Sequence, residues 1–351
     1  MARKKTAIVF FNLGGPDSPD AVRPFLFNLF NDPAIITLPR VFRWMLAQFI
    51  SRRRAPVAQK IYAELGGSSP LLAQTSTQAK ALQVFLADDP DHDYRVFTAM
   101  RYWHPMSDQT AAEVAEWGVE HVVLLPLYPQ FSTTTTESST RDWARAAGQV
   151  GITATTSVIC CYPREPAYIK AQAQLLRREV KQTENQFRVL FSAHGLPVKF
   201  IEGGDPYQWQ IEQCALAIAE EAGLGSGDFR VCYQSRVGRL EWLGPSLDEA
   251  LATAAEQNVG VVVMPISFVS EHSETLVELD IEYKEIAKNL GIKSYRRVPT
   301  LTADPGYIES LAGLARQAAT KNGLCPPDGK RLCPERFGHC LCRDNYQSDA
   351  A

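Results

Sequence analysis

The chain has 351 residues, of which 45% are hydrophobic and 21% are charged, and its formal net charge is −3. This length suits two packed domains or one large α/β unit. The composition is that of a folded globular protein. Without a basic excess to neutralise phosphates, nucleic acid is excluded as an expected partner.

The N-terminus is basic but leads directly into the short apolar run Thr6–Phe11, which ends in a turn at Gly14-Gly15-Pro16. A run this short, without a small-residue cleavage site, indicates a buried first strand and not a signal peptide. No segment approaches the roughly 18 apolar residues of a membrane span. We therefore expect a cytoplasmic protein.

Short apolar runs rich in Val, Ile and Phe alternate with amphipathic stretches along the chain. The runs predict strands at Ala7–Leu13, Arg95–Met100, His121–Tyr128, Thr155–Cys161, Arg188–Ala193, Phe229–Tyr233 and Val259–Ser267. Helical patterns lie between them, for example at Pro166–Val180, Pro206–Ala222 and Glu274–Asn289. Continuous apolar strands are buried on both faces, as in a parallel sheet. This alternation predicts an α/β doubly wound fold.

The two halves of the chain resemble each other. Ala7–Gly14 and Arg188–Gly195 each form an apolar strand with a polar end and a glycine, and Val123–Thr134 parallels Val262–Ser273. Chance similarity among parallel strands is the alternative. The repeat predicts two Rossmann-like halves, each with a mainly parallel four-stranded sheet flanked by helices, and a cleft between them. We expect a first half at 1–180, a second at 181–322, and a cysteine-rich tail at 323–351, with the boundary near the polar segment 181–186.

Ligands in such sheets bind beyond the carboxyl ends of the strands, where His194 and an acidic run stand. His194 can accept protons at neutral pH, although a structural histidine is an equal alternative. The acidic residues Glu271, Glu274 and Glu278 have the spacing of one helical face. A solvated acidic face is the ordinary interpretation, but carboxylates and imidazole at a strand end also suit a divalent ion in transit.

Nucleotide motifs are missing from the sequence. There is no G-x-G-x-x-G and no phosphate loop with its lysine, since the Gly-rich turns at Gly14-Gly15 and Gly66-Gly67 lack these patterns. A dinucleotide enzyme or an NTPase is therefore disfavoured.

Four of the eight cysteines, Cys325, Cys333, Cys340 and Cys342, lie in the last 27 residues. Disulfides are a poor explanation in a reducing compartment. The irregular spacing argues against a zinc knuckle, although zinc or free thiols remain alternatives. An iron–sulfur cluster is favoured, with a fourth ligand from elsewhere in the chain.

The segment Val189–Pro197, continuing to Gly204–Tyr207, resembles the ferrochelatase signature, and the resemblance extends over nearly the whole chain. Supporting stretches are Leu13–Pro16, Gly67–Leu71, Met100–Pro105, Tyr128–Gln130, Gln234–Gly238, Trp242–Pro245 and Glu278–Tyr283. The resemblance implies an enzyme, a lyase that inserts Fe²⁺ into protoporphyrin IX to make haem with release of two protons. Insertion into coproporphyrin III or another tetrapyrrole, or a non-catalytic porphyrin or metal carrier, are the alternatives.

The resemblance also implies roles for single residues. His194 matches the proton-accepting histidine of the family, Glu274 its acidic partner and His272 the hydrogen-bonding neighbour. Glu278 continues an acidic line for metal or protons, so that His194, Glu274 and Glu278 would meet the substrate iron. The expected porphyrin-binding residues are Leu13, Ser69, Arg101, Tyr102, Tyr128 and Trp242.

The tail resembles that of cluster-bearing ferrochelatases, which implies a 2Fe–2S cluster held by Cys333, Cys340 and Cys342. The residue that aligns with the fourth ligand of mitochondrial members is Ala171. We select Cys161 instead, with Cys160 and Cys325 as alternatives. The basic, apolar segment Pro39–Arg54 suggests peripheral membrane contact, although an ordinary packed helix explains it equally well. A homodimer is compatible with the sequence.

Overall fold

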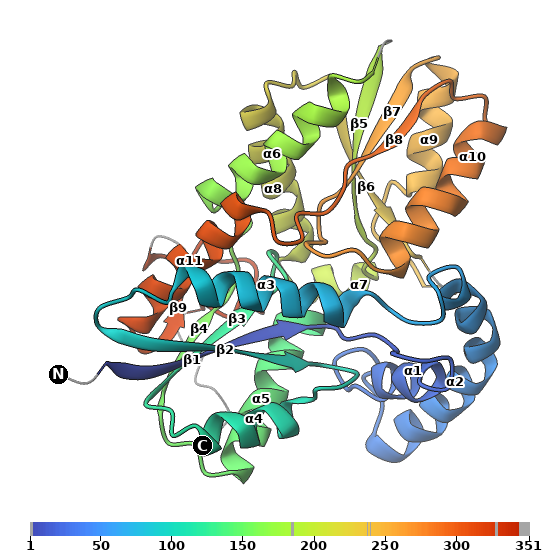
Figure 1. Cartoon of the computed structure of the whole chain (residues 1–351). Helices are drawn as coiled ribbons and strands as arrows, with labels where there is room; N and C mark the ends of the chain where they lie inside the picture. The colour runs from blue at the N-terminus through green and yellow to red at the C-terminus, as the bar shows by residue number, and fades with distance from the viewer. Residues whose placement is uncertain (1–2, 184–185, 237, 239, 327–328, 344–351) are drawn as a thin grey trace. The chain divides into compact units, whose positions relative to one another are not determined.

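The computed structural model describes residues 3–183, 186–236, 238, 240–326 and 329–343. Residues 184–185 of the expected boundary and 344–351 of the expected tail lie outside this description. The chain divides into two compact units (Figure 1). The first contains Met1–Cys161, Leu311–Leu332 and Leu341–Ala351, and the second contains Tyr162–Ser310 and Cys333–Cys340.

A parallel sheet forms the centre of the first unit, in the order β2-β1-β3-β4-β9. Its strands are β1 (Lys4–Asn12), β2 (His92–Met100), β3 (His121–Pro126), β4 (Thr155–Ile159) and β9 (Gly323–Cys325). The apolar segment Ala7–Phe11 of β1 is at most 1% exposed. Because β1 is covered on both faces and paired on both edges, the end of this strand at Asn12 has a fixed position.

Helices cover this sheet on both faces. The helices of this unit are α1 (Val22–Phe30), α2 (Arg40–Ala63), α3 (Leu71–Phe85), α4 (Ser107–Glu116), the short π-helix η1 (Thr133–Glu137) and α5 (Ser138–Gln149). Val9 and Phe11 of β1 pack with Val114 of α4 and Trp143 of α5. Helix α3 lies over the opposite face (Figure 1). Helices α1 and α2 pack together as a hairpin through Phe25, Leu26, Ala55 and Tyr62.

A second parallel sheet, in the order β6-β5-β7-β8, forms the centre of the second unit. Its strands are β5 (Phe187–His194), β6 (Phe229–Gln234), β7 (Gly260–Pro265) and β8 (Tyr295–Arg297). Its helices are α6 (Pro166–Val180), α7 (Val198–Glu202), α8 (Tyr207–Ala222), α9 (Leu247–Glu256), the π-helix η2 (Glu274–Glu282) and α10 (Tyr283–Asn289), and α11 (Pro305–Ala319) follows. Leu251 of α9 and Tyr283 of α10 pack on one face of the sheet, with α6 and α8 on the other (Figure 1).

The α/β doubly wound fold and the internal repeat are confirmed by this topology. In chain order, the first four strands of each sheet are arranged as second, first, third, fourth. A π-helix also follows the third strand in each unit, η1 after β3 and η2 after β7. The resemblance between the two sequence halves is therefore structural.

One detail of the predicted fold is wrong, and two short strands have no counterpart in the sequence prediction. The first sheet has five strands and not four, because β9 from the tail pairs with β4. The short strands β8 and β9 have three residues each, too few to show a sequence period.

The predicted domain boundaries also differ from the observed ones. The first unit ends at Cys161 and not at residue 180, because α6 packs against α8 of the second unit. The described part of the tail is divided between the units, since residues 323–326, 329–332 and 341–343 belong to the first unit and Cys333–Cys340 to the second.

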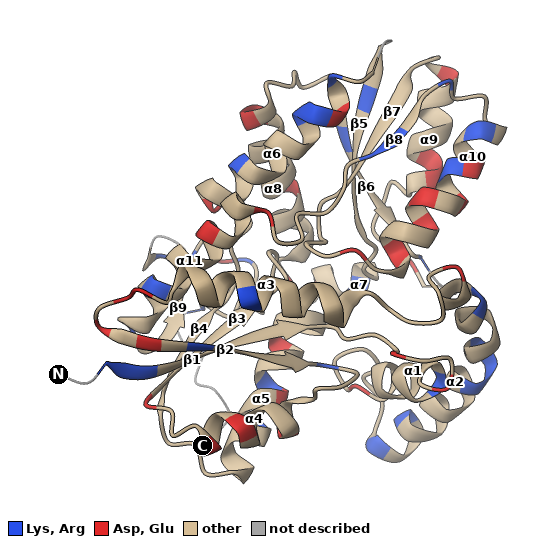
Figure 2. Ribbon diagram, in the orientation of Figure 1, with Lys and Arg blue, Asp and Glu red and all other residues tan. Residues whose placement is uncertain are grey.

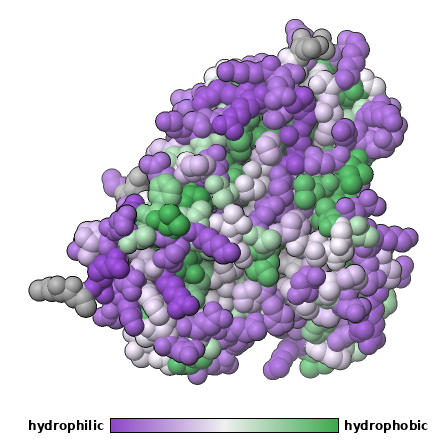
Figure 3. Space-filling model, in the orientation of Figure 1, coloured by the Kyte–Doolittle hydropathy of each residue, from purple (hydrophilic) through white to green (hydrophobic). Residues whose placement is uncertain are grey.

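None of the helices in the described part of the chain is long and apolar enough to cross a membrane. Charged residues lie along the outer helices, including several Lys and Arg positions on α2 (Figure 2). The face seen in Figure 3 is mostly hydrophilic, with scattered hydrophobic patches.

Candidate active site

His194 is the last residue of β5, the strand that β6 and β7 flank on either side. Its backbone is fixed at two points: its N–H donates to Ser267 Oγ at 3.2 Å, and its carbonyl oxygen accepts from Tyr207 Oη at 3.0 Å. The imidazole is half-buried. Trp242 lies nearby, because a Cβ built on Gly195 would be 3.3 Å from its ring. These two hydrogen bonds fix the position of His194 at the end of β5.

The acidic residues Glu274 and Glu278 lie on η2, where the sequence predicts an ordinary α-helix over Glu274–Asn289. The segment begins as a π-helix and becomes α-helical only at Tyr283. A π-helix has i→i+5 hydrogen bonds and often marks a functional site. His272 lies just before it, and His272 Nδ1 accepts from the Glu274 N–H at 3.0 Å. His272 thereby fixes the backbone of Glu274.

The structure brings the histidine and the acidic pair together. His194 Nδ1 lies 2.7 Å from Glu274 Oε2, as the sequence predicts for a histidine and its acidic partner. Ser235 Oγ lies 3.2 Å from Glu274 Oε2 and 2.5 Å from Glu278 Oε2. The Ser235 N–H donates to Glu278 Oε1 at 2.9 Å, and Gln234 Nε2 donates to Glu278 Oε2 at 3.2 Å. One imidazole and two carboxylates therefore form a single network.

The two carboxyl groups differ in acidity. Burial raises the pKa of Glu274, but the charge and hydrogen bond of His194 outweigh burial and lower the pKa to about 2. Burial and the Glu274 charge raise the pKa of Glu278 to about 7, against the hydrogen bonds from Ser235 and Gln234. Burial lowers the pKa of His194, but the charge of Glu274 raises it above the usual value. A proton is therefore held more readily by Glu278 than by Glu274.

Glu271 does not share the face of Glu274 and Glu278, contrary to the sequence prediction. It precedes η2, and its Oε1 accepts from Arg297 Nη1 at 2.7 Å and from the Thr300 N–H at 2.9 Å. Arg297 also forms two hydrogen bonds with Asp280, at 2.8 and 2.7 Å. Arg297 therefore links the segment before η2 to Asp280 of η2. Of the three carboxylates predicted on one face, only Glu274 and Glu278 lie together.

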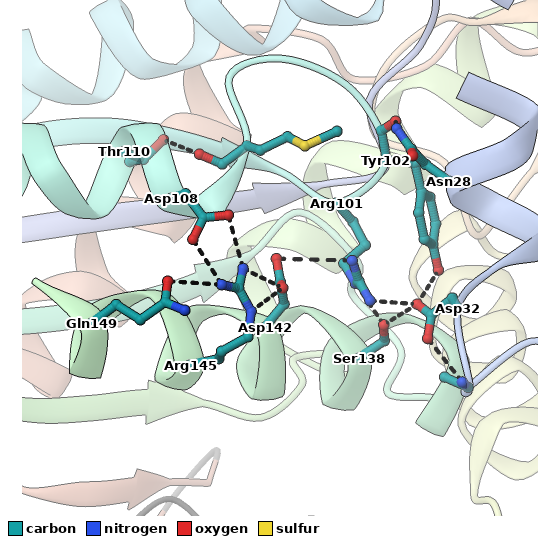
Figure 4. A network of polar contacts seen from close by, with 12 residues as sticks. Asn28, Asp32, Arg101, Tyr102, Asp108, Thr110, Ser138, Asp142, Arg145 and Gln149 are labelled. Atoms are coloured by element: carbon teal, nitrogen blue, oxygen red, sulfur yellow. Dashed lines mark hydrogen bonds and ion pairs between the residues drawn. The ribbon is translucent and has the colours of Figure 1, made fainter. Parts of the chain in front are cut away.

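The other predicted porphyrin-binding residues lie in the first unit. Arg101 and Tyr102 directly follow β2 and belong to a polar network around Asp32 (Figure 4). Asp32 Oδ2 lies 2.8 Å from Arg101 Nη2 and accepts from Tyr102 Oη at 2.8 Å and from Ser138 Oγ at 2.5 Å. Arg101 Nε donates to Ser138 Oγ at 2.7 Å. The guanidinium of Arg101 therefore already contacts Asp32 and Ser138 of α5. Tyr102 is buried, with 1% of its surface exposed.

Leu13, Ser69 and Tyr128 are also held by local contacts. The carbonyl oxygen of Leu13 accepts from the Tyr102 N–H at 3.0 Å, and the Ser69 N–H donates to Pro16 O at 2.7 Å. Tyr128 packs on the apolar cluster that includes Trp143. Their predicted role in porphyrin binding stays a prediction.

Among the cysteines considered for the predicted cluster, Cys160, Cys161 and Cys342 belong to the first unit, and Cys333 and Cys340 belong to the second. In the first unit, Cys342 Sγ lies 3.0 Å from Cys160 Sγ, and Cys161 Sγ lies 3.5 Å from Cys160 Sγ. In the second, Gln210 Nε2 donates to Cys333 Sγ at 3.0 Å, and Cys340 is buried. No group of three or more metal-ligating side chains is arranged for an ion among the residues that the structure describes.

Three contributors to these networks have no predicted role in the sequence. Ser235 stands at a strand end that the sequence marks, but a serine there carries no chemical signal. Asp32 and Arg297 are far in sequence from their partners, so that only the fold shows their contacts.

Solved structures define the class of fold. The Bacillus subtilis protein described as SirB with Fe³⁺ matches 90% of this chain and 96% of its own, with a TM-score of 0.55 and 10% identity. A sirohydrochlorin chelatase SirB from Bacillus subtilis subspecies spizizenii in complex with cobalt matches with a TM-score of 0.51 and 12% identity over 90% of this chain and 96% of its own. The chain shares its fold with these two SirB structures.

Sequence comparison defines the family within this class. The sequence model of the ferrochelatase family matches residues 5–319. The ferrochelatase of Phenylobacterium zucineum (strain HLK1) is 49% identical over 97% of this chain and 98% of its own length. That of Pelagibacter ubique (strain HTCC1062) is 46% identical over 98% of this chain and 100% of its own. The chain belongs to the ferrochelatase family.

The network around Asp32 predicts a difference in stability between two variants. Asp32→Ala leaves the Arg101 guanidinium without its 2%-exposed partner and should lower the free energy of unfolding by about 3 kcal/mol. Asp108→Ala removes the exposed partner of Arg145 instead, and should cost less than about 1 kcal/mol. Chemical denaturation measures both, and equal losses would contradict the role of Asp32.

Proposed function

We propose that this protein is a ferrochelatase, a lyase that inserts Fe²⁺ into protoporphyrin IX to give protohaem and two protons. Membership of the ferrochelatase family supports the reaction. The observation that carries the proposal in this chain is the 2.7 Å contact between His194 Nδ1 and Glu274 Oε2 at the end of β5. Metal insertion needs a group that removes pyrrole protons, and an imidazole backed by a carboxylate is such a group.

The chemistry of the substrate explains why this pair is needed. A flat porphyrin keeps its two N–H protons in the ring plane, and tilting the pyrroles exposes them together with the nitrogen lone pairs. Binding energy from the rest of the macrocycle can hold this strained shape. Protons then leave as the Fe²⁺ dication enters, which preserves the charge balance.

His194 has the geometry of the base in this step. Because Nδ1 donates its hydrogen to Glu274, Nε2 is the nitrogen whose lone pair can take a pyrrole proton. The Glu274 carboxylate then stabilises the imidazolium. His272 acts indirectly, because its Nδ1 holds the backbone N–H of Glu274.

Two variants test the assignment of the base. His194→Ala should abolish iron insertion but leave porphyrin binding, measured by quenching of protein fluorescence, within about threefold of wild type. Glu274→Gln keeps the shape of the side chain but cannot stabilise an imidazolium, and should lower kcat by at least about tenfold.

The assay is anaerobic insertion of Fe²⁺ into protoporphyrin IX, with coproporphyrin III in parallel. A wild type without turnover on either porphyrin would refute the function. Near-normal turnover of His194→Ala would refute the role of the histidine alone.

We further propose that the protein binds a 2Fe–2S cluster through Cys160, Cys333, Cys340 and Cys342. Cysteine thiolates are the usual ligands of such clusters, and three of these four cysteines stand in the tail that resembles that of cluster-bearing ferrochelatases. The sequence prediction selects Cys161 as the fourth ligand, but the distances favour Cys160. Cys160 Sγ lies 3.0 Å from Cys342 Sγ, whereas Cys161 makes its contact with Cys160. Cys325 is directed to the carbonyl oxygen of Gly323.

Adjacent cysteines provide a matched pair of variants. Cys160 and Cys161 are both buried, at 2% and 1% exposure, so that replacement by serine should disturb packing similarly. Cys160→Ser should lose the visible absorbance of the cluster and its acid-labile sulfide, while Cys161→Ser should keep both. The reverse result would restore Cys161 as the ligand.

We also propose that α2 contacts a membrane surface. Val41, Phe42, Met45 and Phe49 share one face of this helix and are between 57% and 67% exposed. Arg40, Arg52 and Arg53 are exposed on the same helix, and Figure 2 shows the basic positions along it. An apolar face with flanking cations suits an anionic lipid surface, where porphyrins partition.

Co-sedimentation with vesicles that contain anionic lipid tests this surface. Phe42→Ser with Phe49→Ser should lower the bound fraction by more than about fivefold, because both exposed rings are lost. Val84→Ser is the control, since Val84 is 75% exposed on α3, outside this surface. Equal binding of the double variant and the control would contradict the proposal.

A further inference from the structure

The hydroxyl of Ser235 lies between the two carboxylates of η2. Its Oγ is 3.2 Å from Glu274 Oε2 and 2.5 Å from Glu278 Oε2. A hydroxyl has one hydrogen to donate and lone pairs that accept, so it can donate to one carboxyl group while accepting from the other. Ser235 therefore hydrogen-bonds the side chains of both Glu274 and Glu278.

The backbone around Ser235 holds the hydroxyl in this position. Ser235 has φ 59°, in the left-handed region that residues other than glycine rarely adopt. Gln234 is fully buried: its Oε1 accepts from Ser192 Oγ at 2.8 Å, and its Nε2 donates to the Glu274 carbonyl oxygen at 3.1 Å. Such a conformation is costly for serine, and strained residues of this kind gather at functional sites.

The contacts form one continuous chain of exchangeable hydrogens. The chain runs from His194 Nδ1 to Glu274 Oε2 over 2.7 Å, from the same oxygen to Ser235 Oγ over 3.2 Å, and from there to Glu278 Oε2 over 2.5 Å. Glu278 is partly exposed and can release a proton to water. The histidine is thus linked to solvent through three side chains.

We propose that Ser235 is a positioning residue that relays protons from Glu274 to Glu278 during metal insertion, an inference that rests on the proposed function. His194 Nε2 takes a proton from a pyrrole nitrogen, and Nδ1 passes its own hydrogen to Glu274 Oε2. Glu274 passes a proton to Ser235 Oγ as the Ser235 hydrogen moves to Glu278 Oε2. Each transfer breaks one N–H or O–H bond and forms another, so the net change is one proton moved from porphyrin to Glu278.

Two variants of Ser235 separate a relay from a purely structural role. Glycine tolerates the left-handed backbone but has no hydroxyl, so Ser235→Gly should keep or raise the thermal midpoint while losing the relay. Threonine keeps the hydroxyl, but its branched Cβ is strained at this φ, so Ser235→Thr should lower the midpoint while keeping the relay. The relay therefore predicts opposite orders for activity and for stability.

Anaerobic iron insertion with purified wild type and both variants measures kcat and the KM for porphyrin. For Ser235→Gly we expect kcat at least about tenfold lower with KM within about twofold, and for Ser235→Thr we expect kcat within about threefold of wild type. A glycine variant with wild-type kcat, or a threonine variant no more active than the glycine variant, would overturn the relay alone. A wild type that inserts no iron would overturn the proposed function and the relay with it.

Discussion

The 2.7 Å contact between His194 and Glu274 joins two residues that are 80 positions apart in the sequence and lie on different elements. The imidazole stands at the end of β5, a strand paired on both edges, and the carboxylate stands at the start of η2. Each group supports the other, because the carboxylate favours the protonated imidazole and the imidazole offsets the burial of the carboxylate. The surrounding contacts, from Ser267, Tyr207 and His272, fix backbones and so preserve this distance.

The repeat shows how one topology supports two kinds of polar network. The residue that follows the second strand of each sheet reaches the helical segment after the third strand. In the first unit this residue is Arg101, which contacts Ser138. In the second it is Ser235, which contacts Glu278. A guanidinium paired with Asp32 gives a stable, charge-balanced arrangement, whereas a hydroxyl between two carboxylates leaves exchangeable protons.

The apolar runs of the sequence account for most of the fold that could be predicted. The buried strands of both sheets, the parallel fold and the histidine at the end of β5 follow from apolar runs and from the position of ligand sites in such sheets. The pairing of Glu271 with Arg297 could not be predicted, since it depends on β8, which has only three residues. The π-helical conformation of η2 could not be predicted either, because the sequence shows no period that distinguishes a π-helix from an α-helix. The position of Cys160 relative to Cys342 depends on contacts between segments 182 residues apart.

Strand β9 has a consequence for the order in which the protein folds. Residues 323–325 supply the outermost strand of the sheet that begins at Lys4, with Val158 of β4 opposite Leu324. During synthesis, the free edge of β4 has no partner until residues 323–325 have left the ribosome. An uncapped edge strand invites pairing with other chains. The sheet of the N-terminal unit is therefore begun first but completed after the second sheet, and a truncated translation product that stops before β9 retains an open edge.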